Sequence, residues 1–289
     1  MHTTIVSTQT LSENLTNPDW VIVDTRFDLM NAAWGRQAYV ASHIPGAHFF
    51  DLNDDLASKP SAGARQGGRH PLPDLDVFLK KLGAIGVSAG TQVVVYDQGS
   101  MMFVGRLWWM LRAWLGHASV AVLDGGYAAW EKELRTVSSA KPGSAIPAAQ
   151  NKHFLANISP NFAVSADSIL SGLAQRAHAI VDARSPERYR GDVEPIDPVG
   201  GHIPGALNRP FPKNVGADGK LLPAAQLRSE FETLLAGRAP QEVVHSCGSG
   251  VSACANLLAM EVAGLTGSKL YAGSWSDWSS DPSRPVVTG

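Results

Sequence analysis

Cysteine is scarce in this chain, which contains only Cys247 and Cys254 among its 289 residues. Two cysteines are too few for a disulfide framework, and such sparing use is typical of proteins in a reducing compartment. The sequence also lacks a cluster of cysteine and histidine at the spacing of metal ligands. We therefore expect a cytoplasmic protein with no metal site.

Excess charge and long apolar runs are also missing. The formal net charge is only −2 at pH 7, which argues against partners such as nucleic acid or a membrane surface. No apolar run is long enough to cross a bilayer, and Met1–Ser7 has no basic stretch followed by an apolar core, so we expect no signal peptide. The chain is nevertheless 44% hydrophobic, which is enough to bury a sizeable core.

The sequence does contain an internal repeat. Four segments of the first half recur in the same order in the second half: Val6-Ser7 as Val164-Ser165, Val21–Arg26 as Ala179–Arg184, His43–Ala47 as His202–Ala206, and Gly125–Trp130 as Gly273–Trp278. Ordered matches of this kind indicate two copies of one fold. We expect an N-terminal domain at residues 1–137, a linker rich in Ser, Ala, Pro and Gly at 138–160, and a C-terminal domain at 161–289.

Each copy alternates short buried strands with helices. The first copy predicts strands at Trp20–Asp24, Gln92–Tyr96 and Val120–Leu123 and helices at Asp74–Leu82 and Gly105–Leu115. The second predicts strands at Ala179–Asp182, Val243–Ser246 and Lys269–Tyr271 and helices at Ala224–Leu235 and Ala253–Val262. This alternation predicts an α/β fold in which each domain has a mostly parallel sheet flanked by helices.

Cys247 stands on the turn between a predicted strand and a predicted helix, at the sheet edge where ligands bind in α/β folds. Gly248 and Gly250 tolerate the backbone angles that turn N–H groups inward, and the helix amino terminus adds partial positive charge. Both effects favour the reactive thiolate. The alternative is a small buried apolar residue, the usual role of a free cysteine, but a Cys-Gly-x-Gly turn is poorly suited to a core.

The segment Cys247–Ala253, with the sequence CGSGVSA, resembles the active-site loop of the 3-mercaptopyruvate sulfurtransferases of the two-domain rhodanese family. The resemblance implies two tandem rhodanese-like domains over nearly the whole chain. It implies that Cys247 accepts sulfur from 3-mercaptopyruvate as a persulfide, with release of pyruvate, and passes it to cyanide, a thiol or a thioredoxin-like protein. The loop residues Gly248, Gly250, Val251 and Ser252 would bind the substrate, and no dissociable cofactor is required.

The two copies differ at the position of the cysteine. Val94–Asp97 aligns with Val244–Cys247, so Asp97 stands where the second copy has its nucleophile. A carboxylate there repels an anionic substrate and cannot carry sulfur. We therefore expect the first domain to be catalytically inactive and to supply one wall of a cleft between the domains.

Arg188 matches the substrate-binding arginine of the resembled family. A guanidinium group binds a carboxylate through two hydrogen bonds, so we expect Arg188 to hold the substrate carboxylate. Arg184 follows Asp182 at a strand end and is expected to pair with it locally. The family has a second binding arginine after Glu-Pro, whereas here Ile196 follows Glu194-Pro195, so the second carboxylate contact has no assigned residue.

His70 and Ser249 match two members of the Ser–His–Asp relay of the resembled family. A lone histidine is otherwise structural or solvated, and the repeated His43 and His202 are expected to be structural. The third position of the relay falls on Asn53, and Asp51 or Asp54 could substitute for it. The resemblance implies that Ser249, oriented by His70, supplies or relays a proton to the leaving enolate.

Three other functions compete with this interpretation. A thiosulfate sulfurtransferase would use the same cysteine, although thiosulfate-preferring members have basic residues where Gly248 and Ser249 stand here. A non-catalytic sulfur carrier would keep Cys247 without a substrate pocket. A cysteine phosphatase would need an arginine at the sixth position after the cysteine, where this chain has Ala253.

Overall fold

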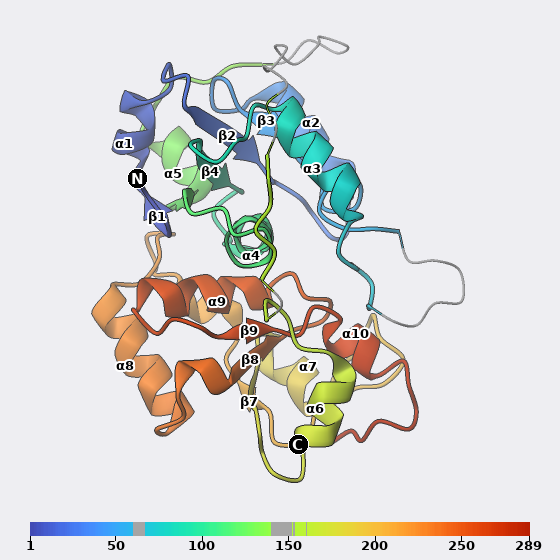
Figure 1. Ribbon diagram of the computed structural model, residues 1–289. Helices are drawn as coiled ribbons and strands as arrows, with labels where there is room; N and C mark the ends of the chain where they lie inside the picture. Colours follow the sequence, from blue (N-terminus) through green and yellow to red (C-terminus); the bar gives the residue numbers. More distant parts are fainter. Residues whose placement is uncertain (60–66, 140–151, 153, 160) are drawn as a thin grey trace. The chain divides into compact units, whose positions relative to one another are not determined.

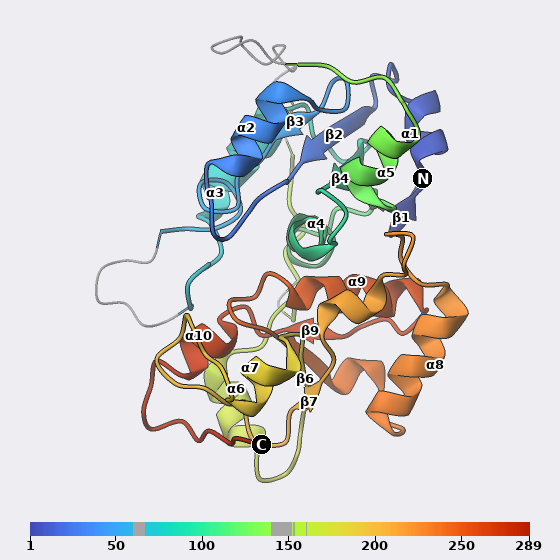
Figure 2. The same cartoon turned by 180° about the vertical axis from the view of Figure 1, so that it is seen from behind.

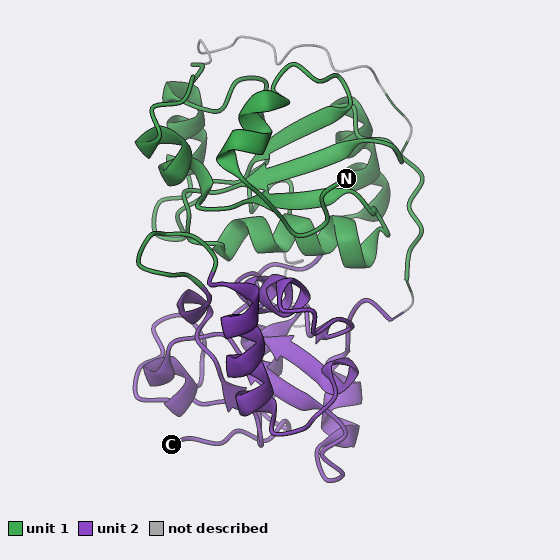
Figure 3. Cartoon of the chain, turned by 90° about the vertical axis from the view of Figure 1, so that its left-hand side faces the viewer, with its two compact units in different colours: residues 1–57, 73–159, 215–221 green, residues 58–72, 160–214, 222–289 purple. Residues whose placement is uncertain are grey.

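The computed structural model describes residues 1–59, 67–139, 152, 154–159 and 161–289 (Figure 1). These residues form two compact units (Figure 3). The first unit consists of Met1–Ala57, Pro73–Ser159 and Val215–Leu221, and the second consists of Ser58–Leu72, Pro160–Asn214 and Leu222–Gly289. Most of the linker predicted at 138–160 lies outside the described residues.

The first unit is built on a five-stranded parallel sheet with the order β1-β5-β4-β2-β3. Its strands are β1 (Ile5–Val6), β2 (Trp20–Asp24), β3 (His48–Phe49), β4 (Gln92–Tyr96) and β5 (Val120–Leu123). Every residue of the central strand β4 is buried, as expected for a valine-rich strand covered on both faces. The register pairs Asp24 at the end of β2 with Tyr96 at the end of β4.

The helices of the first unit are α1 (Thr8–Glu13), α2 (Trp34–Ala41), α3 (Leu75–Ala84), α4 (Met102–Trp109), the π-helical turn η1 (Met110–Trp114) and α5 (Gly126–Lys132). Leu11 of α1, Tyr39 of α2 and Trp130 of α5 share one buried cluster with Val94 of the sheet. Helices α1 and α5 lie side by side in both views (Figures 1 and 2). Helix α4 packs on β4 and β5.

The second unit contains a four-stranded parallel sheet with the order β7-β6-β8-β9. Its strands are β6 (Ala179–Asp182), β7 (Leu207–Asn208), β8 (Val243–Ser246) and β9 (Lys269–Leu270). The register pairs Asp182 with Ser246, which is the relation that Asp24 has to Tyr96 in the first sheet. The residue after β8 therefore occupies the same topological position as the residue after β4.

The helices of the second unit are α6 (Ala166–Gly172), α7 (Pro186–Arg190), the 3-10 turn η2 (Phe211–Asn214), α8 (Ala224–Leu235), the 3-10 turn η3 (Pro240–Glu242), α9 (Ala253–Val262) and α10 (Ser274–Trp278). Ile169 of α6 and Trp275 and Trp278 of α10 form a buried cluster with Val244 of β8. Helix α9 packs on β8 and β9, and α8 packs on α9. The helix that follows Cys247 is thus fixed against the strand that precedes it.

The predicted α/β fold with mostly parallel sheets and flanking helices is confirmed. The strands β2, β4, β5, β6 and β8 begin and end at the predicted residues. The helix predicted at Gly105–Leu115 instead begins at Met102 and changes to π-helical geometry at Met110. The Asp97 carboxylate accepts the N–H of Phe103, which satisfies a donor of the first turn and lets the helix start earlier than its apolar periodicity indicates.

The repeated Val-Ser pairs mark the starts of two helices. Ser7 caps α1 by accepting the N–H of Thr10, and Ser165 caps α6 by accepting the N–H of Ser168. In the part of the chain that the structure describes, no helix combines the length and apolar character needed to cross a bilayer. The same residues contain no group of three or more His, Cys, Asp or Glu side chains placed to hold a metal ion.

Candidate active site

Cys247 lies directly after β8 and is 1% exposed. Its N–H donates to Ser274 Oγ at 3.0 Å, and its carbonyl accepts the N–H of Trp275 at 2.9 Å. The Ser274 hydroxyl donates to the Tyr271 carbonyl at 2.9 Å and lies 4.0 Å from Cys247 Sγ. The start of α10 therefore holds the backbone of the cysteine on both sides.

Ser274 occupies a strained backbone conformation, with φ at +52°. The aligned residue of the first unit is Gly126, which has φ at +59° and is free of the penalty that a side chain adds there. A serine kept in this conformation costs folding energy, and such strain gathers where the side chain has a task. Here the side chain accepts the N–H of Cys247.

Gly250 makes the close turn that follows the cysteine. Its φ is +75°, and a methyl group at this position would lie 2.2 Å from the Ala272 carbonyl oxygen. Among the described residues, the backbone N–H groups of Gly248, Ser249, Val251 and Ser252 donate to no protein acceptor. Neighbouring unpaired N–H groups before a helix attract an anion. The predicted loop thus presents donors at the amino end of α9.

Asp97 fills the corresponding loop of the first unit with a carboxylate of the chain itself. One carboxylate oxygen accepts the N–H of Gly99 at 2.7 Å, and the other accepts the hydroxyl of Ser100 at 3.0 Å and the N–H of Phe103 at 3.3 Å. Asp97 is 1% exposed. Asp97 therefore holds three donors of this loop, and the position has no nucleophile.

His70 and Ser249 are brought together by the structure. The Nδ1 atom of His70 lies 2.7 Å from Ser249 Oγ. The preceding segment is fixed to the loop by Ser276, which donates its N–H to the Gly248 carbonyl at 2.9 Å and accepts the N–H of Arg69 at 3.0 Å. All of these residues belong to the second unit, because Ser58–Leu72 is part of it.

Two guanidinium groups lie beside the loop. A methyl group at Gly248 would lie 3.0 Å from Arg69 Nη2 and 3.6 Å from Arg188 Nη1. Arg188 was expected near the loop from the sequence. Sequence reasoning missed Arg69, although it stands directly before His70. The segment that brings it to the loop has positive φ at Gly67 and Gly68. A methyl group at Gly68 would lie 2.4 Å from the Gly273 carbonyl oxygen, so glycine is what lets this segment approach α10.

Two buried carboxylates hold these guanidinium groups. Glu194 pairs with Arg188 Nη2 at 2.6 Å, and Asp197 forms ion pairs with Arg69 and, at 3.4 Å, with Arg188. Burial raises the pKa of Asp197, although both arginines act to lower it. Burial also acts to raise the pKa of Glu194, but the hydrogen bond from Arg188 and two backbone N–H donors outweigh it and lower the pKa.

Arg184 is a structural residue, as the sequence indicates. Its side chain is 2% exposed, pairs with Asp182 at 2.7 Å and donates to the Gly201 carbonyl at 2.6 Å. In the first unit, Arg26 pairs with Asp24 at 2.7 Å and donates to the Ser42 carbonyl in the same way. The repeated pair fixes the chain after β2 and after β6. His43 and His202 are also alike, since each stacks on a tyrosine and bonds a tyrosine carbonyl through Nδ1.

The three residues considered for the third relay position lie in the first unit, whereas His70 belongs to the second. Asp51 is buried and accepts the N–H groups of Asn53 at 2.8 Å and Asp54 at 3.4 Å. Burial raises the pKa of Asp51 despite these two hydrogen bonds. The choice among Asn53, Asp51 and Asp54 stays a prediction.

His245 lies two residues before Cys247 but is a poor acid or base. It is fully buried on β8 with Nε2 3.1 Å from Met260 Sδ, and among the described residues its Nδ1 has no hydrogen-bond partner. Burial lowers the pKa of His245 to about 3, so the ring is neutral near pH 7. His70 is therefore the better-placed histidine for proton transfer.

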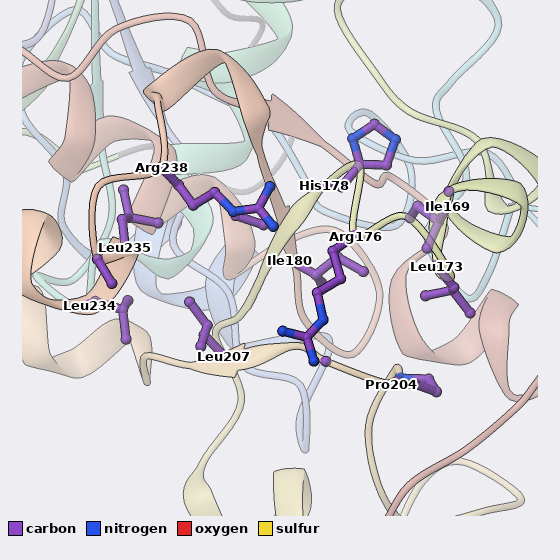
Figure 4. Close-up of a pocket in the computed structure, with 14 residues that line it drawn as sticks. Ile169, Leu173, Arg176, His178, Ile180, Pro204, Leu207, Leu234, Leu235 and Arg238 are labelled. Carbon is purple, nitrogen blue, oxygen red and sulfur yellow. The ribbon is translucent and has the colours of Figure 1, made fainter.

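A cavity of about 380 Å³ lies elsewhere in the second unit, near the start of β6 (Figure 4). Arg176 and Arg238 line it together with Ile180 and Leu207. None of the predicted site residues is among the described residues that line this cavity. Cys247 follows the opposite, carboxyl end of the sheet, so the candidate site rests on the chemistry of its loop rather than on this cavity.

Comparisons with known proteins match both halves of the chain. The family model of the rhodanese-like domain matches residues 7–133 and 165–281. The chain is 44% identical to a probable 3-mercaptopyruvate sulfurtransferase of Pseudomonas aeruginosa over 99% of this chain and 98% of that protein. It is 38% identical to a putative thiosulfate sulfurtransferase, SseB, of Mycobacterium tuberculosis over 93% of this chain and 90% of that protein.

A solved structure agrees with the fold of the whole chain. The 3-mercaptopyruvate sulfurtransferase from Leishmania major superimposes with a TM-score of 0.82 at 29% identity, over 96% of this chain and 74% of that chain. The names of these similar proteins include two sulfur donors, 3-mercaptopyruvate and thiosulfate.

Proposed function

The chain belongs to the rhodanese family and is a sulfurtransferase with two rhodanese-like domains, and from this premise we propose that it transfers sulfur from 3-mercaptopyruvate through a persulfide on Cys247. The observation that carries the proposal is the surroundings of Cys247. Unpaired N–H groups follow it in the loop, and Arg69 and Arg188 lie beside Gly248. This combination suits a donor that has both a reactive sulfur and a carboxylate.

The first step is attack by the Cys247 thiolate on the sulfur of 3-mercaptopyruvate. A sulfur–sulfur bond forms, the carbon–sulfur bond of the donor breaks, and its electron pair stays on carbon as the enolate of pyruvate. The S–H proton of the donor, which the new persulfide loses as it ionises, completes pyruvate. The persulfide is an anion, and the N–H groups of Gly248, Val251 and Ser252, with that of Gly250, are the donors proposed to stabilise it.

The carboxylate of the donor is proposed to bind Arg69 and Arg188. Arg69 would supply the second carboxylate contact, because Ile196 stands after Glu194-Pro195 where the family has an arginine. Among the described residues, Arg69 Nη2 and Arg188 Nη1 make no hydrogen bond, and these are the atoms nearest Gly248. Each guanidinium can therefore offer an N–H group to a ligand while its other nitrogens stay paired.

The second half of the reaction returns the cysteine to its thiolate. A thiophilic acceptor attacks the outer sulfur of the persulfide, and Cys247 leaves. Cyanide serves in an assay, and we propose a thiol or a thioredoxin-like protein as the acceptor in a cell. The first unit is proposed to be inactive, because Asp97 stands in place of the nucleophile. No cofactor is needed for either step, and the cytoplasmic location stays a prediction.

Thiosulfate is the alternative donor, and the name of the Mycobacterium tuberculosis relative favours it. Its leaving group, sulfite, is a dianion that needs net positive charge beside the cysteine. Here Arg69 and Arg188 are matched by Asp197 and Glu194, and Gly248 and Ser249 add no charge. The balance of charge therefore favours 3-mercaptopyruvate.

We expect the wild-type protein to use 3-mercaptopyruvate with a kcat/KM at least about tenfold above that for thiosulfate, equivalent to about 1.4 kcal/mol in the transition state. Steady-state assays with both donors and cyanide as acceptor measure this ratio. Equal or better turnover of thiosulfate would contradict the donor assignment. A protein that binds sulfur on Cys247 but turns over neither donor would instead be a non-catalytic carrier.

The Ser249 hydroxyl is the proposed proton source for the enolate, and His70 Nδ1 lies 2.7 Å from it. We expect Ser249→Ala and His70→Gln to lower kcat with 3-mercaptopyruvate by roughly 10²-fold, the low end of general acid catalysis. Turnover of thiosulfate should fall much less, since sulfite needs no proton to leave. Equal losses with both donors would show that the pair supports the loop and does not move the proton.

A further inference from the structure

Asp197 joins the two guanidinium groups beside the candidate nucleophile, and we propose that its carboxylate makes the site select sulfur donors with one negative charge over donors with two. The proposal rests on the function proposed above and names a residue that determines its specificity. Asp197 would touch neither the sulfur nor the cysteine. It would act through the charge and the position of Arg69 and Arg188.

The contacts of Asp197 set it apart from the other acids of its segment. One carboxylate oxygen pairs with Arg69 Nη1 and the other lies 3.4 Å from Arg188 Nη2. Its side chain is 4% exposed, whereas that of Asp192, in the same segment, is 53% exposed. A shielded charge is screened less by water and salt, so it acts more strongly on its neighbours.

Each guanidinium forms its ion pairs through some of its nitrogens and places another nitrogen, unpaired among the described residues, next to the loop. Arg69 uses Nη1 for Asp197 and places Nη2 next to Gly248. Arg188 uses Nε and Nη2 for Glu194 and places Nη1 next to Gly248. The acids leave Arg69 Nη2 and Arg188 Nη1 for a donor, whereas Arg188 Nη2, 3.8 Å from a methyl group at Gly248, stays paired with Glu194 and Asp197.

The charges of this group cancel before a donor binds. Three positive charges, Arg69, Arg184 and Arg188, face three negative charges, Asp182, Glu194 and Asp197. The carboxylate of 3-mercaptopyruvate can bind the free N–H edges as a hydrogen-bonded monoanion. Thiosulfate brings a second negative charge, which the nearby Asp197 repels, while the charges of the surrounding ion pairs already cancel. Asp197 thus disfavours a donor with two negative charges without contacting it.

Removing the charge of Asp197 should shift donor preference. We expect Asp197→Asn, which keeps the shape and one hydrogen-bond acceptor, to raise the ratio of kcat/KM for thiosulfate to kcat/KM for 3-mercaptopyruvate by roughly tenfold, the scale of one unscreened charge acting on one extra charge of the donor. The change should come mainly from a lower KM for thiosulfate. Both donors are assayed on the same preparation with cyanide as acceptor.

Asp192→Asn is the matched control. It removes the same charge from the same segment, and Asp192 forms an exposed ion pair with Arg190 at 2.8 Å. The donor ratio of this variant should stay within about twofold of wild type, as expected for a solvated surface pair. A ratio measured on one preparation does not depend on the folded fraction, so partial misfolding of Asp197→Asn does not hide the effect.

Two results would overturn the proposal. One is an unchanged ratio in Asp197→Asn, with both donors losing activity together, which would mean that Asp197 only supports the arginines. The other is an equal shift in Asp192→Asn, which would mean that overall charge and not this carboxylate sets the preference. Failure of the proposed function is separate, because it appears as wild-type protein that does not turn over 3-mercaptopyruvate.

Discussion

Cys247→Ser is expected to abolish sulfur transfer, with a fall in kcat of roughly 10⁵- to 10⁶-fold, the scale seen when a catalytic nucleophile is removed. A serine hydroxyl is not ionised near pH 7 and cannot form a persulfide. Serine is close to cysteine in size, so the fold should be retained although the site is buried. Steady-state kinetics with cyanide as acceptor give the loss, and a thermal melt confirms that the variant is folded.

Cys254→Ser is the matched control, since Cys254 is the other cysteine of the chain. Its thiol points at the Gly250 carbonyl at 3.4 Å from within α9, and a serine hydroxyl can donate to the same oxygen. This variant should keep most of the activity. Mass spectrometry of wild-type protein after treatment with the donor should find one extra sulfur on Cys247. Finding that sulfur on Cys254 would overturn the assignment of the nucleophile.

Arg188→Ala is expected to lower kcat/KM with 3-mercaptopyruvate by roughly 10²- to 10³-fold, comparable to the loss of one charge-stabilising donor. The reason is that Arg188 Nη1 faces Gly248 and is one of two cationic groups placed there. Steady-state kinetics with substrate varied around KM measure the effect. Glu194 keeps an ion pair with Arg184 at 3.3 Å, so we expect the fold to tolerate the loss of Arg188.

Arg184→Ala serves as the contrast, because Arg184 lies in the same segment but is buried in a structural ion pair. Removing it leaves Asp182 without its partner, which should cost roughly 3 kcal/mol of unfolding free energy. The activity of the folded fraction should fall less than in Arg188→Ala. If Arg184→Ala were the stable, inactive variant and Arg188→Ala the unstable, active one, the roles of the two arginines would be exchanged.

The strands could be predicted from the sequence because each is a short run of buried residues. Val243–Ser246 and Gln92–Tyr96 are fully buried, so their composition alone marks their limits. The repeat also predicted that Asp97 and Cys247 occupy equivalent positions, and the registers of the two sheets support this. Helix limits were harder to predict, since the start of α4 depends on a side chain, Asp97, that lies outside the helix.

The arrangement around the cysteine could be predicted only in part. Cys247, Gly248 and Gly250 lie in one short loop, so the local sequence was enough to identify them. Arg69 could not be assigned, because its approach to Gly248 depends on a turn at Gly68 and on a contact with Ser276, which is distant in sequence. Sequence reasoning also missed Ser274. The repeat could have indicated it, because the aligned residue of the first copy is Gly126.

The carboxylate of Asp97 has a consequence for how the two halves of the duplication behave over a reaction cycle. In the first unit, the loop after β4 keeps a permanent internal anion, which holds the N–H groups of Gly99 and Phe103 and the Ser100 hydroxyl whatever molecules are present. In the second unit, no carboxylate of the described residues fills the loop after β8, and under the proposed mechanism the anion there changes from the Cys247 thiolate to the persulfide when sulfur is loaded. Local rigidity there should therefore rise with persulfide formation and fall with sulfur delivery, while the first unit stays constant and acts as an internal reference.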